Sequence, residues 1–295
     1  MFNPFHAPGP FLKGNLHLHT TQSDGRLEPQ EAIDLYRDAG YDFLAITDHN
    51  RLTLTSGLDT RGITLLPGME LDQGRGELEQ TVHIVAIGME TSLEVPQTRS
   101  LQSAITYISA RSKFCFVAHP NWSSLTYRDL LGAKGHVGLE VFNTTCERGI
   151  GRGDSSETWN QLLARGERLL GFAVDDAHMH YPDALGGWVM LKAGSNAPED
   201  ILSALISGAF YSSSGPTIED VSFAEDHVTV RCSPCQAVNL ISPRPGCGAT
   251  AHAVAGGGAP YTHVSLPFSP RWAPVRIECV DEHGRKAWTN PFWLD

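Results

Sequence analysis

The chain has 295 residues and a formal net charge of −11, and 41% of its residues are hydrophobic. This length allows one large domain, or one large and one small domain. The acidic balance argues against a nucleic-acid-binding surface, which usually carries a basic excess, and no apolar stretch is long enough to span a bilayer. The N-terminal residues do not resemble a signal peptide, and the six cysteines are scattered, so we expect a cytoplasmic protein without a disulfide framework.

The first two-thirds of the sequence alternate between short apolar runs and helical patterns. One helix is expected from Pro29 to Gly40, and apolar positions three or four residues apart predict others near 101–108, 162–163 and 198–208. Such alternation predicts parallel strands with helical crossovers, and seven or eight strands favour a closed barrel. The expected strands are residues 15–19, 43–47, 63–66, 82–88, 114–118, 138–142, 169–174 and 187–193.

The pattern changes after Tyr211. Residues 212–216 form a turn-rich junction, beyond which no helical period is visible. Strands are expected at 228–231, 238–241, 263–266, 275–280 and 286–289, and the Gly- and Ala-rich segment 246–258 is expected to be a loop. We therefore predict an α/β domain over residues 1–215 and a small all-β, sandwich-like domain over residues 216–295.

Histidine and carboxylate residues recur at the ends of the predicted strands. His17 and His19 are two residues apart on a strand, so they share a face, and Asp176 and His178 repeat this spacing. In a parallel β/α barrel the C-terminal ends of all strands open on one rim, where these side chains would converge. The complete set is His17, His19, Asp24, His49, Glu70, His83, His119, Asp176 and His178.

Each part of this set is weak evidence alone. A single H-x-H motif is usually not a metal site, Asp24 in Ser23-Asp24-Gly25 would usually form a turn, and His83 or His119 could be satisfied core histidines. Together, however, they would be nine costly polar burials without a common purpose. We therefore predict a site for two or three divalent ions, and imidazole and carboxylate ligands suit zinc, manganese or iron.

The sequence resembles the polymerase and histidinol phosphatase (PHP) superfamily. The resemblance rests on segments 13–20, 23–25, 46–50, 118–120 and 176–178, together with Glu70 and His83. It implies a distorted seven-stranded (β/α)7 barrel of the PHP type. The end of the chain, at 287–291, resembles the C-terminal module of carbaryl-hydrolase-type PHP metallohydrolases.

The resemblance also implies how the ligands divide between the ions. Glu70 would bridge two ions. The first ion would be held by His17, His19, Glu70 and Asp176, the second by Glu70, His83 and His119, and the third by Asp24, His49 and His178.

A phosphoesterase is the function that this site predicts. Two or three divalent ions would leave the pocket positively charged, which favours a small anionic substrate such as a nucleotide or sugar phosphate. A metal-bridging hydroxide would attack phosphorus, with Glu70 and Asp176 as catalytic residues and Asp176 as a proton carrier. The alternative is a carboxylic or carbamate ester hydrolase using the same site. A nuclease, or a binding module without catalysis, is less consistent with the acidic charge and the intact ligand set.

Three further residues are candidates for substrate binding. Arg148, on the loop after the sixth strand, could clamp a phosphate, although a solvated loop arginine is an equal alternative. His180 and Asn50 follow ligand residues closely and could contact substrate, or be ordinary loop residues. The pair Cys232 and Cys235 lacks a second pair at zinc-ribbon spacing, so we interpret it as structural or incidental.

Overall fold

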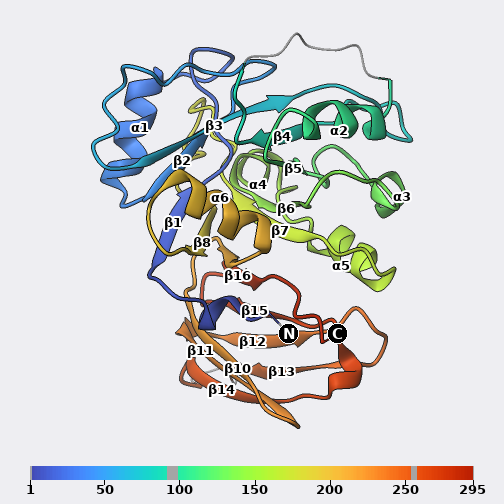
Figure 1. The fold of residues 1–295 in the computed structure, drawn as a ribbon. Helices are drawn as coiled ribbons and strands as arrows, with labels where there is room; N and C mark the ends of the chain where they lie inside the picture. The colour runs from blue at the N-terminus through green and yellow to red at the C-terminus, as the bar shows by residue number, and fades with distance from the viewer. Residues whose placement is uncertain (1, 92–98, 254–257, 295) are drawn as a thin grey trace.

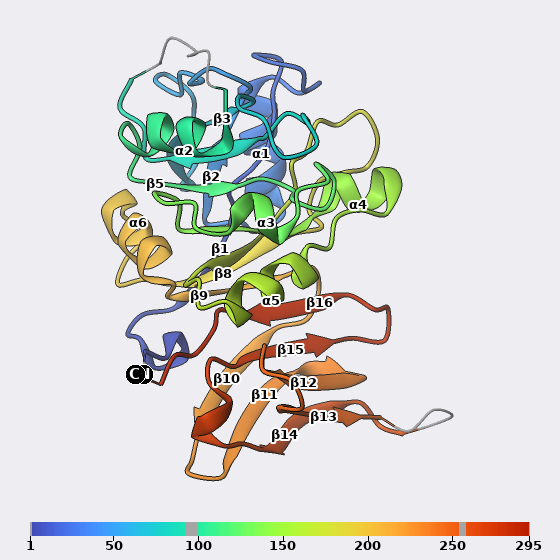
Figure 2. The same ribbon diagram turned by 90° about the vertical axis from the view of Figure 1, so that its right-hand side faces the viewer.

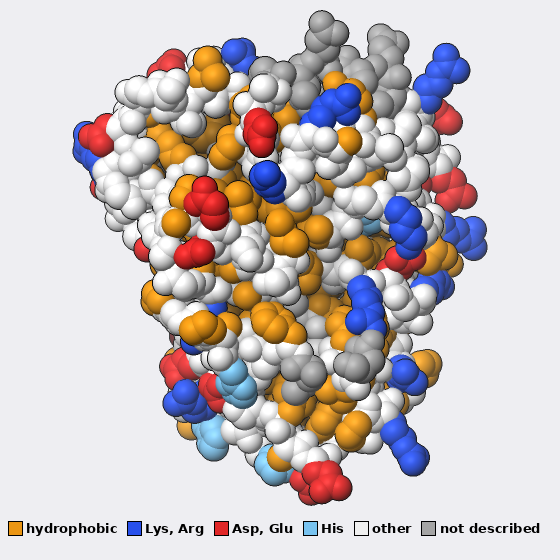
Figure 3. Space-filling model, viewed as in Figure 1, with side chains coloured by type: hydrophobic (Ala, Val, Ile, Leu, Met, Phe, Trp, Pro, Cys, Tyr) orange, Lys and Arg blue, Asp and Glu red, His pale blue; other side chains and the backbone are white. Residues whose placement is uncertain are grey.

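The structure, a computed structural model, describes residues 2–91, 99–253 and 258–294. It has an α/β part and, below it in Figure 1, a module of strands that we call the β module. The view in Figure 2 shows the same two parts stacked on each other. On the face drawn in Figure 3, Lys and Arg side chains are interspersed with Asp and Glu side chains, so the acidic excess is not gathered into one patch there.

The α/β part is built from nine strands and six α-helices within the described residues. Its strands are β1 (Phe11–Asn15), β2 (Phe43–Ile46), β3 (Thr64–Leu71), β4 (Ile84–Ile87), β5 (Phe114–Val117), β6 (Gly138–Asn143), β7 (Leu170–Val174), β8 (Trp188–Lys192) and β9 (Phe210–Ser213). Its helices are α1 (Pro29–Asp38), α2 (Leu101–Ser109), α3 (Tyr127–Leu130), α4 (Thr144–Ile150), α5 (Ser156–Ala164) and α6 (Pro198–Ser207).

The β module follows β9 in the chain. Its strands are β10 (Ile218–Phe223), β11 (His227–Cys235), β12 (Ala237–Ile241), β13 (Gly248–His252), β14 (Tyr261–Pro267), β15 (Arg276–Val280) and β16 (Lys286–Thr289). Short 3₁₀ helices lie at Pro4–His6 and Pro270–Trp272. Strand β13 corrects the predicted loop at 246–258, of which residues 254–257 lie outside the described residues. Strands β9 and β10 had no counterpart in the sequence prediction.

One mixed sheet runs through both parts of the molecule. Its order is β13-β12-β15-β16-β9-β8-β1-β2-β3-β4-β5-β6-β7, and β10-β11-β14 form a second sheet. Strands β1-β2-β3 and β5-β6-β7 are parallel, whereas β4 is antiparallel to both of its neighbours. The segment 72–83 before β4 contains turns and no crossover helix, and a parallel pairing would need such a crossover.

The predicted (β/α)7 barrel is not confirmed, because the described strands do not close into a ring. The segments just beyond β1 and β7 nevertheless meet. Leu18 and Ala177 form an isolated parallel bridge, His19 N donates to Ala177 O at 2.9 Å, and Asp176 N donates to His17 O at 2.8 Å. The curled sheet therefore brings the continuations of β1 and β7 side by side, where the motif residues lie.

Helices α1, α2 and α6 begin and end close to where the sequence predicts, and α5 contains the predicted positions 162–163. Helices α3 and α4 had no counterpart in the sequence prediction, and α4 replaces the loop expected to carry Arg148. In α1, Pro29 occupies the first turn, Glu28 and Glu31 form a capping box, and the buried face includes Ile33 and Tyr36. Helix α6 ends at Gly208, whose φ of 76° is the left-handed conformation that glycine adopts without strain. Within the described residues, no helix combines the length and apolar character needed to cross a membrane.

Aromatic packing makes the middle of the α/β part rigid. The Phe172 ring lies 4.5 Å from that of Phe116 and 4.9 Å from that of Phe210, and all three side chains are fully buried. A separate core in the β module combines residues from its two facing sheets, including Val230 and Ile277. The strand ends that carry the motif residues are thus held by a packed interior.

Candidate metal centre

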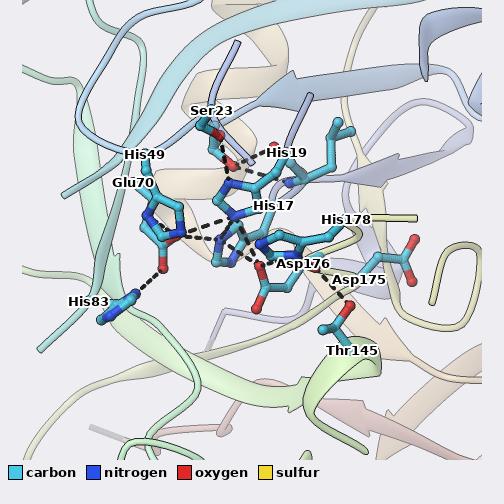
Figure 4. Close-up of polar contacts among 12 residues, drawn as sticks. His17, His19, Ser23, His49, Glu70, His83, Thr145, Asp175, Asp176 and His178 are labelled. Carbon is cyan, nitrogen blue, oxygen red and sulfur yellow. Dashed lines mark hydrogen bonds and ion pairs between the residues drawn. The ribbon is translucent and has the colours of Figure 1, made fainter. Parts of the chain in front are cut away.

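Four motif side chains meet at one point in the interior (Figure 4). His17 Nε2 lies 3.1 Å from His19 Nε2, 3.3 Å from Glu70 Oε2 and 3.2 Å from Asp176 Oδ1. His19 Nε2 lies 3.2 Å from Glu70 Oε2 and 3.0 Å from Asp176 Oδ1. We call this set the inner cluster; its side chains are at most 7% exposed.

The spacing of the inner cluster fits a common cation. Imidazole and carboxylate ligands bind zinc at about 2.0–2.1 Å, so neighbouring ligand atoms around one ion lie about 3.0–3.4 Å apart. The observed separations, 3.0–3.3 Å, fall in this range. Two carboxylates and two imidazoles buried together would also leave unbalanced negative charge unless protons or a cation supplied the balance.

Two buried atoms beside this point lack hydrogen bonds. Asp176 Oδ1 and His49 Nδ1 have no hydrogen-bond partner among the described residues, although Asp176 Oδ1 is close to His19 Nε2. Buried polar atoms are rarely left unsatisfied. The lone pairs of these two atoms are therefore free to coordinate a bound ion, and the residues present fit a metal ion.

Glu140 supports the inner cluster and was missed by the sequence analysis. It is fully buried, its Oε1 lies 2.6 Å from His17 Nδ1, and its Oε2 accepts from His119 N and from Asn143 Nδ2. Because Glu140 accepts the Nδ1 proton, the Nε2 lone pair of His17 faces the cluster, as in carboxylate–histidine–metal arrangements. An acidic residue within the apolar run 138–142 was the signal that could have identified it.

The two oxygens of Glu70 face different neighbours. While Oε2 faces the inner cluster, Oε1 lies 2.9 Å from His83 Nδ1 and 3.3 Å from His119 Nε2. His119 Nδ1 is held in turn by Ser123 Oγ at 2.9 Å. Glu70 thus lies between two ligand sets, which is the position that a bridging carboxylate would need.

A third set lies nearer to solvent. Asp24 Oδ2 lies 3.4 Å from His178 Nε2 and 3.7 Å from His49 Nε2, and the Asp24 side chain is 54% exposed. The hydrogen bond with His178 lowers the pKa of Asp24 despite its partial burial, which keeps the carboxylate charged. His19 Nδ1, 3.5 Å from Asp24 Oδ1, connects this outer set to the inner cluster.

Local backbone conformation aims these side chains. His17 and His19 lie just beyond β1, corrected from the predicted strand at 15–19, on either side of the bridge at Leu18. His119 and Asp176 have φ values of 29° and 57°, which residues other than glycine rarely adopt. Such conformations persist where the surroundings enforce them, and they cluster at functional sites.

Seven of the nine predicted ligands line one pocket of about 340 Å³, namely Asp24, His49, Glu70, His83, His119, Asp176 and His178. His17 and His19 lie behind it, against Glu70 and Asp176. Its lining includes the carboxylates of Asp24, Glu70, Asp176 and Asp183 and several imidazoles, and no Lys or Arg is among its described lining residues. Trp122, Ile150 and Tyr181 form an apolar wall, and the Trp122 ring meets His119 edge-on at 5.0 Å. These three side chains were also missed, since nothing in their spacing sets them apart.

The predicted substrate-binding residues lie in different places. Arg148 Nη1 donates to the backbone oxygens of Pro182 and Ala184, and the residue lines a separate hollow beside β16, so the geometry gives no support to a phosphate clamp there. Asn50 lies next to Glu70 through its backbone, but its side chain binds Asp72.

His180 does line the pocket. Its Nδ1 accepts a hydrogen bond from Arg26 Nε at 2.9 Å, and its Nε2 donates to Asp24 O at the same distance. Both ring nitrogens are therefore engaged, and His180 fixes the loop that carries Asp24.

Exchange of Asp24 for Ala should remove one equivalent of metal and leave the rest. The outer set is more exposed than the inner cluster and depends on this carboxylate, whereas Glu70 and Asp176 stay in place. Elemental analysis after gel filtration measures the metal content, with Asp59→Ala, an exposed loop carboxylate, as the matched control. Unchanged metal content, or loss of all metal, would contradict the division into inner and outer sets.

Metal removal should make thermal stability fall as pH rises. Burial lowers the pKa of His19, but interactions with Asp176 and Glu70 outweigh it and raise the pKa to about 9. In the metal-free protein this protonated imidazole stabilises the fold below pH 6.5, and the contribution is lost as pH rises toward 9. Bound metal requires deprotonated ligands, so the gain in Tm on metal binding should grow over the same interval.

Calorimetry of metal-free and metal-loaded protein from pH 6.5 to 9 measures both slopes. A His19→Asn variant serves as the control, because its metal-free form should lose most of the slope. Parallel curves for the two forms of the unaltered protein would show that protons and metal do not compete at this site.

Comparison with known proteins agrees with the motifs. No family model matches the chain. It is 26% identical to an uncharacterized protein of Methanocaldococcus jannaschii over 163 residues, 47% of this chain and 86% of that protein. It is 39% identical to the 3',5'-nucleoside bisphosphate phosphatase of Chromobacterium violaceum over 83 residues, which cover 26% of this chain and only 27% of that protein.

A solved structure from Bacteroides vulgatus resembles the whole molecule. That protein is described as a two-domain protein containing a predicted PHP-like metal-dependent phosphoesterase. The two structures align over 98% of each chain with a TM-score of 0.52 at 17% sequence identity. The resemblance of the C-terminal module to carbaryl-hydrolase-type enzymes stays a prediction. The chain is thus PHP-like in fold, in agreement with the resemblance to the PHP superfamily that its sequence motifs indicate.

Proposed function

We propose that the protein is a metal-dependent hydrolase of small phosphate esters. The observation that carries the proposal is that seven of the nine predicted ligands line one pocket, with His17 and His19 packed against its Glu70 and Asp176, and that Glu70 faces two sets at once. The similarity of part of the chain to a nucleoside bisphosphate phosphatase supports the same reaction class. We expect two or three ions of zinc, manganese or iron, as imidazole and carboxylate ligands favour.

Divalent cations held here would polarise a phosphoryl oxygen and bring the pKa of bound water near neutrality. The chain itself supplies orientation. Asn143 Nδ2 donates to Asp176 Oδ2 at 3.1 Å, which leaves Asp176 Oδ1 directed into the cluster. Asp176 therefore stays our candidate for proton transfer. Glu70 stays our candidate for joining the ion of the inner cluster to the ion that His83 and His119 would hold.

The pocket favours a substrate with an apolar group next to the ester. Its described lining offers no guanidinium or ammonium group, so the charge of a phosphate would be met by the cations alone. Trp122, Ile150 and Tyr181 are 43%, 62% and 40% exposed, which leaves their surfaces available to a ligand. Small-molecule sites are commonly apolar with a few fixed polar groups.

The missing basic side chains also favour a second candidate. A carboxylic or carbamate ester carries no phosphate charge and needs no Lys or Arg, so it would fit the same cations and the same apolar wall. This reaction is the alternative that the experiment must separate from phosphate ester hydrolysis.

A substrate panel tests the proposal. Metal-reconstituted protein would be assayed with aryl phosphate monoesters and diesters, nucleotides, aryl acetates and aryl carbamates. We expect turnover of phosphate esters that chelation abolishes, and a loss of at least about 100-fold in kcat/KM for Glu70→Gln. Turnover confined to acetates or carbamates would favour the second candidate, and metal-loaded protein inactive on every ester would refute both.

Trp122 should govern affinity for the apolar part of the substrate. We expect Trp122→Ala to raise KM for an aryl phosphate by about 2- to 12-fold, because an aromatic contact contributes about 0.5–1.5 kcal/mol. The KM for methyl phosphate should change less. Trp122→Phe, which keeps a ring beside His83 and His119, is the matched control, and metal content is measured in each variant. Equal effects on both substrates would exclude this role.

A further inference from the structure

Three cysteines meet in the β module, far in the fold from the histidine and carboxylate cluster. Cys232 and Cys235 lie on β11 and Cys279 on β15, and their sulfur atoms all lie within 4.8 Å of one another. All three are free thiols and at most 2% exposed. The inner face of the module therefore holds a compact group of soft donor atoms.

A deformation of β11 creates this group. Residues three apart on a regular strand point to opposite faces, so Cys232 and Cys235 should not both face inward. The pairing of β11 with β14 shifts between Arg231, which faces His263, and Cys235, which faces Tyr261. Four residues on β11 thus match two on β14, a bulge that turns both thiols toward the interior and leaves Pro234 exposed.

Cys279 comes from a regular strand in the other sheet of the module. It faces Val238 of β12 and Ala287 of β16 in the pairing of β15, and it is completely buried. The bulge on β11 therefore brings two sulfur atoms from one sheet against a third from the facing sheet. A bulge that re-aims side chains in this way is a feature typical of built sites.

The charged neighbours of the group are acidic. The carboxylates of Glu219 and Asp281 act on its thiols. Nearby negative charge favours a cation over an anion as the ligand of these three sulfur atoms.

Two simpler interpretations account for less. Buried cysteines can serve as small apolar residues, but then no strand distortion is needed to collect them. A disulfide would join two of the sulfurs and leave the third without a role. One ion at about 2.3 Å from each of three sulfurs would set them about 3.8–4.0 Å apart, which the observed grouping allows with small movements.

We propose that Cys232, Cys235 and Cys279 form a second metal site, a three-thiolate site for the thiophilic ions Cu(I) or Zn(II). Thiolates select these ions over magnesium, calcium and manganese. Within the described part of the chain no His, Asp or Glu joins this group, so Zn(II) would need a further ligand, whereas Cu(I) accepts three sulfurs. Binding displaces the thiol protons to solvent and transfers no electrons.

The test uses the full-length protein purified without oxygen and loaded with Zn(II) or Cu(I) in parallel. X-ray absorption at the copper edge should show three sulfur neighbours at about 2.3 Å, and at the zinc edge a sulfur shell averaged with the nitrogen and oxygen neighbours of the other site. Cobalt(II) loading should add one equivalent with a thiolate-to-metal charge-transfer band, which the nitrogen and oxygen ligands of the other site cannot produce. Retention against a zinc chelator and against a copper(I) chelator identifies the ion that is preferred.

Variants locate the signal. Cys279→Ala should lose the band and one metal equivalent, whereas Cys247→Ala, a cysteine of the same module outside the group, should keep both. If Cys279→Ala does not fold, the sulfur count of the unaltered protein decides alone. Absence of sulfur neighbours and of the band, or a disulfide among the three cysteines in a peptide map of the anaerobic protein, would overturn the proposal.

Discussion

The balance of charge at Glu70 and Asp176 is the constraint on which the rest of the structure depends. Both carboxylates are buried, and one oxygen of each, Glu70 Oε2 and Asp176 Oδ1, lies within 3.3 Å of both His17 Nε2 and His19 Nε2. Such a group is stable only if something positive lies among its members, because isolated buried charges are very costly. In the metal-free protein protons on the imidazoles supply that charge, and the raised pKa of His17, which opposes the effect of its burial, expresses the same demand.

The sheet satisfies this constraint by bringing distant parts of the sequence together. The bridge between Leu18 and Ala177 joins the first and the last segments that carry motif residues. Glu140 then ties β6 to both His17 and the backbone of His119. The cluster is therefore assembled from strand ends whose positions are fixed by pairing and packing rather than by flexible loops, as a precise constellation requires.

The sequence predicted which His, Asp and Glu side chains gather at the site and the ends of α1 and α6, but not the short helices α3 and α4, the open sheet or the shape of the pocket. Metal-binding residues recur with fixed spacings, and Gly208 and Pro29 mark helix ends by their own backbone chemistry, so local patterns sufficed. Strand β4 runs antiparallel to its neighbours because the connection before it contains no helix. The apolar pattern of a strand does not show whether a helix precedes it. Trp122 and Glu140 act through contacts with residues distant in the chain, which no local pattern records.

The continuous sheet has a consequence for the independence of the β module. Strand β16 pairs with β9, Trp288 stacks on Phe142 at 5.7 Å, and Asn290 Oδ1 accepts a hydrogen bond from Gly171 N. Severing the chain after residue 215 would strip β9 of its neighbour and expose a backbone edge open to intermolecular pairing. The two parts should therefore melt in a single cooperative transition, and the module acts as a permanent flank of the α/β part rather than as a tethered appendage.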